Sequence, residues 1–237
     1  MVFTPTYHRE GKLCDNCSLL SITTDDGIEL EGVVSEPTDA TETLLVFVGR
    51  SHDAVGIINK LAATYAHVRV VSFNYRSYGK SKGSVNEQNI FSDALRVAQL
   101  VEKNYGEFSL LGYSLGSSVA AHVATKQKLK NLFLIGAFDS IASLAKSKFV
   151  DRSFFPYINL SKVFRYKFRT GVHMQNVITP TYLFVGLNDE VTYIQNAREL
   201  KENIKNLVFY EELPNLSHKE ILWDKAVVDK INEVINV

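Results

Sequence analysis

Hydrophobic positions along the chain follow two alternating patterns. Short apolar or β-rich runs predict strands, largely buried on both faces, at 43–49, 69–75, 108–111, 131–137, 179–187 and 206–213. Apolar residues at helical spacing predict helices over about 55–65, 86–104, 192–204 and 218–236. Strands that alternate with helices indicate an α/β fold, with a mostly parallel, doubly wound sheet and helices on both faces. Sites in such sheets lie at the carboxyl ends of the strands.

The first part of the chain has a different pattern. Residues 18–24 and 29–35 alternate apolar and polar positions around an Asp-Asp-Gly turn, which predicts an antiparallel hairpin at the edge of the sheet. Just before it, Cys14 and Cys17 form a C-x-x-C motif. A zinc ribbon requires a second pair, and a thioredoxin-like site requires a helix that begins at the motif. We therefore expect a turn with two reduced thiols, and a local redox or metal role stays open.

Two predicted helices have capping signals before them. Ser84 and Glu87 have the spacing of a capping box for the helix over 86–104. Ser217 and Glu220 have the same spacing for the helix over 218–236.

Residues 138–178 do not fit the alternation of strands and helices. The stretch is too long for a simple connection, and an insertion of this kind is typical of a small cap or lid. Its part from 146 to 169 is rich in Lys, Arg and aromatic residues. One interpretation is amphipathic helices with solvated cations. The other is a cap that accepts a negatively charged acyl or aromatic group, or that touches a membrane surface.

Length and charge limit the possible functions. A chain of 237 residues has room for one core, so we expect a single domain over 1–237. Lys and Arg number 26 and Asp and Glu also number 26, so no overall field attracts nucleic acid. The N-terminus lacks the apolar core of a signal peptide, and no apolar run is long enough to cross a bilayer. The expected location is therefore cytoplasmic.

Residues 108–118 carry the strongest candidate chemistry, in the sequence F-S-L-L-G-Y-S-L-G-S-S. A strand, a sharp turn and a helix place Ser114 at the apex, where Gly112 and Gly116 let strand and helix pass closely. The helix directs unsatisfied N–H groups at the serine, and the N–H of Leu115 points to where an oxyanion would form.

A serine nucleophile needs a base and a carboxylate, which are expected at later strand ends. Asp189 follows the strand that ends at Leu187, and His218 follows the last strand. Asp139, after the strand over 131–137, is the alternative acid. The other histidines all precede the last strand: His8, His52, His67, His122 and His173.

With these residues, the sequence resembles the α/β-hydrolase superfamily, whose members have G-x-S-x-G at the elbow and the order Ser, Asp, His. The resemblance covers about residues 18–237. A second motif, N-Y-R-S-Y-G-K-S-K-G at 74–83, is similar to the D-Y-R-G-Y-G-x-S-x-G loop of small esterases, thioesterases and lysophospholipase-like members. The resemblance implies that Ser114, Asp189 and His218 are catalytic.

The second oxyanion donor is expected in the loop after the strand over 43–49, where superfamily members often read His-Gly and this chain reads Val48-Gly49. The backbone N–H of Arg50 is the candidate. Candidate substrate-binding residues are Arg50, Tyr113, Phe154 and Phe155.

The implied activity is hydrolysis of a small carboxylic ester or thioester, with an anionic or acyl group among the options. No motif for a metal or an organic cofactor is present, and none is expected. A peptidase, an acyltransferase and a non-catalytic binding protein on the same fold stay open as alternatives. The sequence leaves the oligomeric state undetermined.

Overall fold

A computed structural model describes residues 2–148 and 164–236 of the protein. Across these ranges eight strands form one sheet, in the order β1-β2-β4-β3-β5-β6-β7-β8. β1 pairs antiparallel with β2, and β2 with β4, whereas the remaining neighbours are parallel. The strands are β1 (Cys17–Thr23), β2 (Glu29–Ser35), β3 (Thr43–Phe47), β4 (Arg69–Phe73), β5 (Ser109–Tyr113), β6 (Leu132–Ile135), β7 (Thr181–Gly186) and β8 (Leu207–Leu213).

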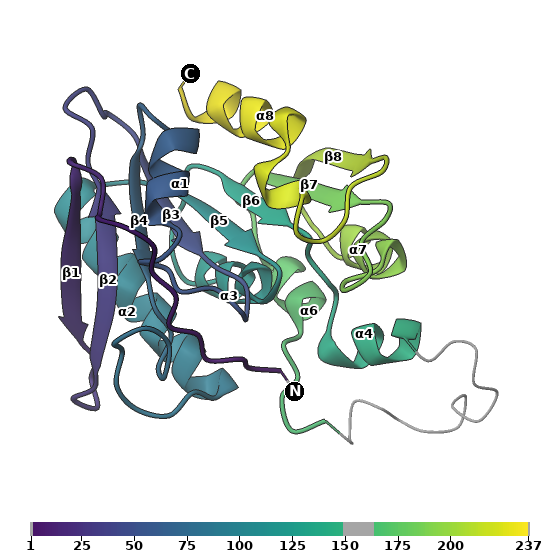
Figure 1. Ribbon diagram of the computed structural model, residues 1–237. Coiled ribbons are helices and arrows are strands. Elements are labelled where there is room, and N and C mark those ends of the chain that lie inside the picture. Colours follow the sequence, from purple (N-terminus) through teal and green to yellow (C-terminus); the bar gives the residue numbers. More distant parts are fainter. Residues whose placement is uncertain (1, 149–163, 237) are drawn as a thin grey trace.

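Helices cover both faces of this sheet, as the alternating pattern predicts. α1 and α8 lie together on one face, where the Asn232 amide donates to the Thr64 carbonyl at 3.3 Å, and α2 and α3 lie on the other (Figure 1). The helices are α1 (Ile58–Thr64), α2 (Glu87–Tyr105), α3 (Leu115–Ala124), α4 (Ile141–Lys148), α6 (Thr170–Met174), α7 (Ile194–Lys201), the 3₁₀ helix η1 (Ile221–Trp223) and α8 (Lys225–Ile235).

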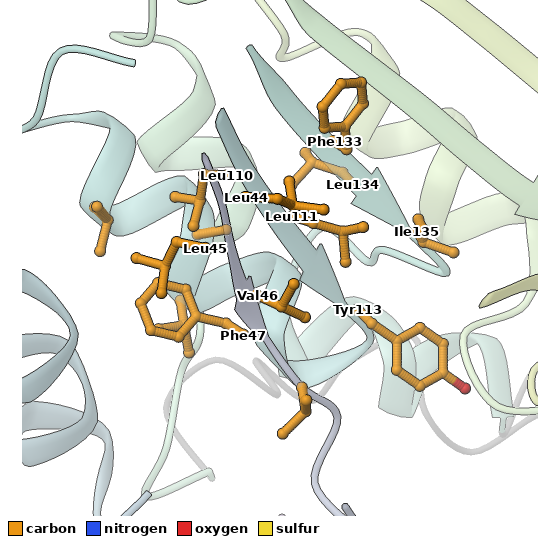
Figure 2. Close-up of a cluster of buried hydrophobic side chains, with 14 of the residues drawn as sticks. Leu44, Leu45, Val46, Phe47, Leu110, Leu111, Tyr113, Phe133, Leu134 and Ile135 are labelled. Carbon is orange, nitrogen blue, oxygen red and sulfur yellow. The ribbon is translucent and has the colours of Figure 1, made fainter. Parts of the chain in front are cut away.

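The core is centred on the parallel strands β3, β5 and β6. Figure 2 shows their side chains packed on the two faces of the strands, with Leu44, Leu45 and Leu111 among them. These three leucines have no exposed surface. Because helices cover both faces, both faces of these strands are largely apolar, and this explains why the sequence shows nearly continuous apolar runs here.

The N-terminal hairpin is antiparallel and lies at the edge of the sheet, as expected. The prediction of two reduced thiols before it is wrong, because Cys14 and Cys17 are joined in a disulfide. A turn closed by a 2.9 Å bond from the Cys17 N–H to the Cys14 carbonyl brings the two residues together. Their Cα atoms are 5.0 Å apart, which lies within the range that a disulfide spans.

Both predicted capping boxes are wrong. The N-cap of α2 is Asn86, whose side chain accepts from the Asn89 N–H at 2.9 Å. The N-cap of α8 is Asp224, so the last helix begins later than predicted, after the short helix η1. Ser217 does bond Glu220, but this contact closes a turn ahead of η1. The local spacing rule thus found one real polar pair, Ser217 with Glu220, without finding the helix starts.

The expected cap over 138–178 includes α4 and α6, while its part from 149 to 163 lies outside the described residues. Phe154 and Phe155 are therefore outside them too. Instead of capping α2, the carboxylate of Glu87 accepts from the N–H groups of Lys167 at 2.6 Å and Phe168 at 2.7 Å. The first turn of α2 thus holds the end of this insertion. That the insertion acts as a cap stays a prediction.

Within the described ranges, no helix combines the length and the apolar composition that crossing a bilayer requires.

Candidate active site

Ser114 lies between the end of β5 and the start of α3, in a backbone conformation that residues other than glycine rarely adopt. Its φ is 53° and its ψ is −118°. The neighbouring strand and helix hold this conformation. The Ser114 N–H donates to the Ile135 carbonyl at 2.9 Å, and the Ser117 hydroxyl donates to the Ser114 carbonyl at 2.6 Å. The hydroxyl of Ser114 therefore projects from a fixed apex.

The glycines on either side of the apex meet the steric need that the sequence predicts. A Cβ on Gly112 would lie 2.5 Å from the Gly116 carbonyl oxygen. A Cβ on Gly116 would lie 1.9 Å from the Phe47 carbonyl oxygen. Neither position has room for a larger residue. The start of α3 is thus packed directly against the end of β3, which brings Leu115 and the loop that contains Arg50 to the same edge of the sheet.

The structure brings Ser114, His218 and Asp189 together in one hydrogen-bonded row. His218 Nε2 is 2.9 Å from Ser114 Oγ, and His218 Nδ1 is 2.7 Å from Asp189 Oδ2. These residues come from the ends of β5, β7 and β8, far apart in the sequence. Their exposed fractions are 8%, 7% and 4% for Ser114, His218 and Asp189, so the row is largely shielded from water.

Asp189 is fixed by its own loop. The N–H groups of Val191 and Thr192 donate to Oδ1 at 2.8 and 2.7 Å, and the Thr192 hydroxyl donates to Oδ2 at 2.6 Å. Burial acts to raise the pKa of Asp189, but the bond and charge of His218, together with the Thr192 bonds, outweigh it and lower the pKa. The carboxylate is therefore ionised at neutral pH and can orient an imidazole.

The alternative acid, Asp139, contacts other groups. Its carboxylate accepts from the Asn203 amide at 3.2 Å, and its carbonyl accepts from the Gly171 N–H at 3.2 Å. Burial and the nearby Glu199 raise the pKa of Asp139, the opposite of what an orienting carboxylate requires. The structure therefore favours Asp189 over Asp139.

Of the remaining histidines, only His52 lies next to the row. Its ring meets that of Tyr113 edge-on, with 5.5 Å between centroids, and burial lowers its pKa. The other histidines contact groups away from the row: His8 with Glu10, His67 with Asp39, and His122 and His173 with Phe91.

Two residues support the row in ways that the sequence did not reveal. The Tyr113 hydroxyl donates to the His218 carbonyl at 2.7 Å, and its ring stacks on the imidazole at 5.2 Å. That Tyr113 binds substrate stays a prediction; its observed ring contacts are with His218 and His52. Gly136, with φ of 55°, leaves space for the side chains of His218 and Asp189. A Cβ at this position would lie 3.2 Å from His218 Cε1 and 3.6 Å from Asp189 Oδ2. The one available signal was the position of Gly136 directly after a buried strand.

Among the remaining candidates, Leu115 is buried at the first position of α3 and Arg50 is exposed in the loop after β3. That their backbone N–H groups stabilise an oxyanion stays a prediction. A hydroxyl activated by a histidine, beside backbone donors, is an arrangement suited to acyl transfer.

No protein-family model matches the chain. Relatives in sequence include two proteins that are described only as uncharacterized. One, from Acanthamoeba polyphaga mimivirus, is 28% identical over 84% of this chain and 74% of its own length. The other, from Mycobacterium tuberculosis, is 22% identical over 90% of this chain and 77% of its own length.

Solved structures are similar over nearly the whole chain. An esterase of Pyrococcus furiosus aligns with a TM-score of 0.72 and 16% identity, covering 100% of this chain and 98% of the esterase. An α/β hydrolase from a Penicillium species aligns with a TM-score of 0.71 and 13% identity, over 93% of this chain and 98% of that one. A serine hydrolase without a lid, from Xanthomonas campestris, aligns with a TM-score of 0.64 and 18% identity, covering 96% of this chain and 95% of that one.

Proposed function

The chain has the α/β-hydrolase fold, as its sequence predicts, and from this fold and the row at its strand ends we propose that it is a serine hydrolase of carboxylic esters or thioesters. The observation that carries the proposal is the continuous contact from Ser114 Oγ to His218 Nε2 at 2.9 Å and from His218 Nδ1 to Asp189 Oδ2 at 2.7 Å. The esterase and hydrolase names of the structural neighbours support the same class of reaction.

In the proposed mechanism, His218 Nε2 takes the proton of Ser114 as the hydroxyl oxygen attacks the substrate carbonyl carbon. Asp189 keeps Nδ1 protonated and stabilises the imidazolium that forms. The N–H groups of Leu115 and Arg50 stabilise the oxyanion, and each such donor contributes about 3 kcal/mol in comparable enzymes. The leaving alcohol or thiol takes the proton from His218, and the acyl group stays on Ser114.

Water completes the cycle. His218 deprotonates a water molecule, which attacks the acyl-enzyme, and Ser114 regains its proton as the carboxylic acid leaves. The buried position of the row favours this chemistry, because charges that develop in a site with little water interact more strongly with fixed donors.

A fluorophosphonate probe tests the proposal. The probe should label the wild-type protein and fail to label Ser114→Ala. Ser118→Ala is the matched control. Ser118 is fully buried in α3, the helix that follows Ser114, and its hydroxyl has no hydrogen-bond partner among the described residues. It should be labelled like wild type.

Proteins that are labelled, the wild type and Ser118→Ala, should also hydrolyse p-nitrophenyl esters or acyl thioesters, whereas Ser114→Ala should not. A correctly folded wild-type protein that is neither labelled nor active on either series would contradict the proposal and favour a binding protein. Series of increasing acyl length would then define the substrate class of an active enzyme.

A further inference from the structure

The loop motif at 74–83 has no part in the proposed reaction, yet its residues hold the loop that contains Arg50. The Tyr75 hydroxyl donates to the Val48 carbonyl at 2.8 Å. The Tyr78 hydroxyl donates to the Arg50 carbonyl at 2.6 Å. Asn74 continues the contact, because its side-chain oxygen accepts from the Ala54 N–H at 2.7 Å. The motif therefore bonds the loop along its whole length.

The proton of Tyr78 is committed to the Arg50 carbonyl. The Thr4 N–H donates to the Tyr78 oxygen at 2.9 Å, so this oxygen already serves as an acceptor and its single proton goes to the other partner. Both tyrosines are buried, at 6% exposed for Tyr75 and 0% for Tyr78. Burial raises the pKa of each, so both hydroxyls remain donors across the pH range in which an esterase works.

The two tyrosines bracket the peptide bond between Gly49 and Arg50. The carbonyl of that peptide accepts from the His52 N–H at 3.2 Å. In a trans peptide the N–H points away from the carbonyl, so this bond gives the Arg50 N–H its direction. The carbonyls on either side of this peptide, those of Val48 and Arg50, accept from Tyr75 and Tyr78, so both ends of the segment that carries the Arg50 N–H are held in place.

We propose that Tyr78, with Tyr75, is a positioning residue that fixes the direction of the Arg50 N–H toward the oxyanion. This inference rests on the proposed function. An oxyanion donor is effective because it is oriented before the reaction begins. The hydroxyls thus act on the transition state through the loop, without contact with the substrate.

The test compares Tyr78→Phe with Tyr65→Phe. Tyr65 is equally buried, and its hydroxyl has no hydrogen-bond partner in the described part of the chain, so this control removes a buried hydroxyl without releasing the loop. In Tyr78→Phe we expect kcat on a p-nitrophenyl ester to fall about tenfold with KM within about twofold of wild type, because only the transition state carries the oxyanion. Tyr65→Phe should keep the wild-type kcat.

An inhibitor gives a second kinetic readout. A trifluoromethyl ketone accepts Ser114 at its carbonyl carbon and leaves an oxyanion in the same position. Its affinity should fall in Tyr78→Phe by about the factor lost from kcat/KM. If both quantities stay at the wild-type level, the inference is overturned.

Amide hydrogen exchange separates this inference from the proposed function, because it needs no turnover. Exchange at residues 49–53 should be faster in Tyr78→Phe than in Tyr65→Phe. Equal exchange overturns the inference even if the protein proves inactive. If Tyr78→Phe does not fold, the same comparison is made with Tyr75→Phe, which releases the Val48 carbonyl and should give the same changes.

Discussion

At the scale of single residues, Asp189 and Asp139 illustrate how a carboxylate is assigned its role. Both follow a buried strand, and sequence position favours Asp189 while keeping Asp139 as the alternative. In the structure, Asp189 is 2.7 Å from His218 Nδ1 and has a lowered pKa, whereas Asp139 bonds Asn203 and has a raised pKa. The contact with His218 therefore supports the proposed orienting role for Asp189 and not for Asp139.

We predict that Asp189→Asn lowers kcat by about four powers of ten. An asparagine at this position stabilises the wrong tautomer of the imidazole, and it has no negative charge to stabilise the imidazolium. Asp139→Asn should leave kcat within about threefold of wild type, because Asp139 bonds Asn203 and does not contact the row of Ser114, His218 and Asp189. Both are measured on the same p-nitrophenyl ester. A larger loss in Asp139→Asn than in Asp189→Asn would reverse the assignment.

Tyr113 permits a second prediction at this scale. In Tyr113→Phe the stacked ring remains, but the His218 carbonyl loses its donor. A net hydrogen bond is worth about 1 kcal/mol, so we expect kcat to fall roughly two- to tenfold while KM changes little. Steady-state kinetics beside Tyr65→Phe give the comparison. Identical kinetics in the two variants would show that the hydroxyl does not position His218.

The residues brought together in the row could be proposed from sequence because each belongs to a local pattern: an elbow for Ser114 and a strand end for Asp189 and His218. The contacts of Tyr113 and Gly136 could not be. Both depend on how the His218 loop passes over β5 and β6, and no local pattern records the distance between segments about a hundred residues apart.

At the scale of elements, periodicity predicted the order and type of the described strands and of the principal helices. Periodicity also located the start of α2 within one residue, but the capping signals did not mark the helix starts, and the last helix begins at Lys225 instead of near 218. The first turn of α2 is capped by Asn86, which leaves Glu87 to bond the Lys167 and Phe168 N–H groups. A capping rule considers neighbours in sequence, whereas here a distant segment competes for the same carboxylate.

The packing of α3 against α2 and α6 gives a pH prediction. His122 of α3 stacks on Phe91 at 4.3 Å and meets His173 at 4.9 Å. Burial, with repulsion from His173 and Lys126, lowers the pKa of His122 from 6.5 to about 4. The unfolded chain therefore binds the proton first as the pH falls, and stability decreases between pH 6.5 and about 4.

Urea unfolding at pH 7.5 and at pH 4.5 tests this. The first value lies roughly one unit above the ordinary histidine pKa, and the second lies between that pKa and the lowered pKa of His122. His122→Gln should lose less stability between the two conditions than wild type. Because burial also lowers the pKa of His173, the variant His122→Gln/His173→Gln should lose less still. The same loss in all three proteins would exclude these histidines as its source.

At the scale of the whole molecule, the N-terminal segment joins parts of the fold that the sheet alone does not connect (Figure 1). Phe3 packs on Tyr166 with 4.8 Å between ring centroids, at the end of the insertion over 138–178. Thr4 bonds Tyr78, and the Gly79 N–H donates to the Thr6 carbonyl at 2.9 Å. The segment thus ties the insertion to the loops around the candidate site.

Arg9 is the charged centre of this connection. It bonds Glu31 of β2 and lies 3.3 Å from Asp53 in the loop after β3. Both carboxylates are shielded from water, with side-chain exposures of 10% and 1%. The Asn74 amide lies between them, 3.2 Å from Glu31 and 2.8 Å from Asp53. Within the described part of the chain, Arg9 is therefore the cation that both buried carboxylates pair with.

We predict that Arg9→Met lowers the free energy of unfolding by about 3 kcal/mol, because it leaves both carboxylates buried without a cation. Arg96→Met is the control: Arg96 is 3.8 Å from Asp25, and their side chains are 49% and 93% exposed, so its loss should cost under about 0.5 kcal/mol. Urea midpoints measured at constant slope give both values.

A second substitution separates charge from packing at this position. If the deficit of Arg9→Met comes from the unpaired anions, then Arg9→Met/Glu31→Gln should regain part of the lost stability, because a neutral amide removes one buried charge while keeping its shape. If the deficit comes from the missing stem of Arg9, the added substitution should deepen it, since Glu31 also accepts from the Lys80 N–H at 2.8 Å. Recovery in the double variant would therefore identify the N-terminal segment as an electrostatic support of the loop after β3.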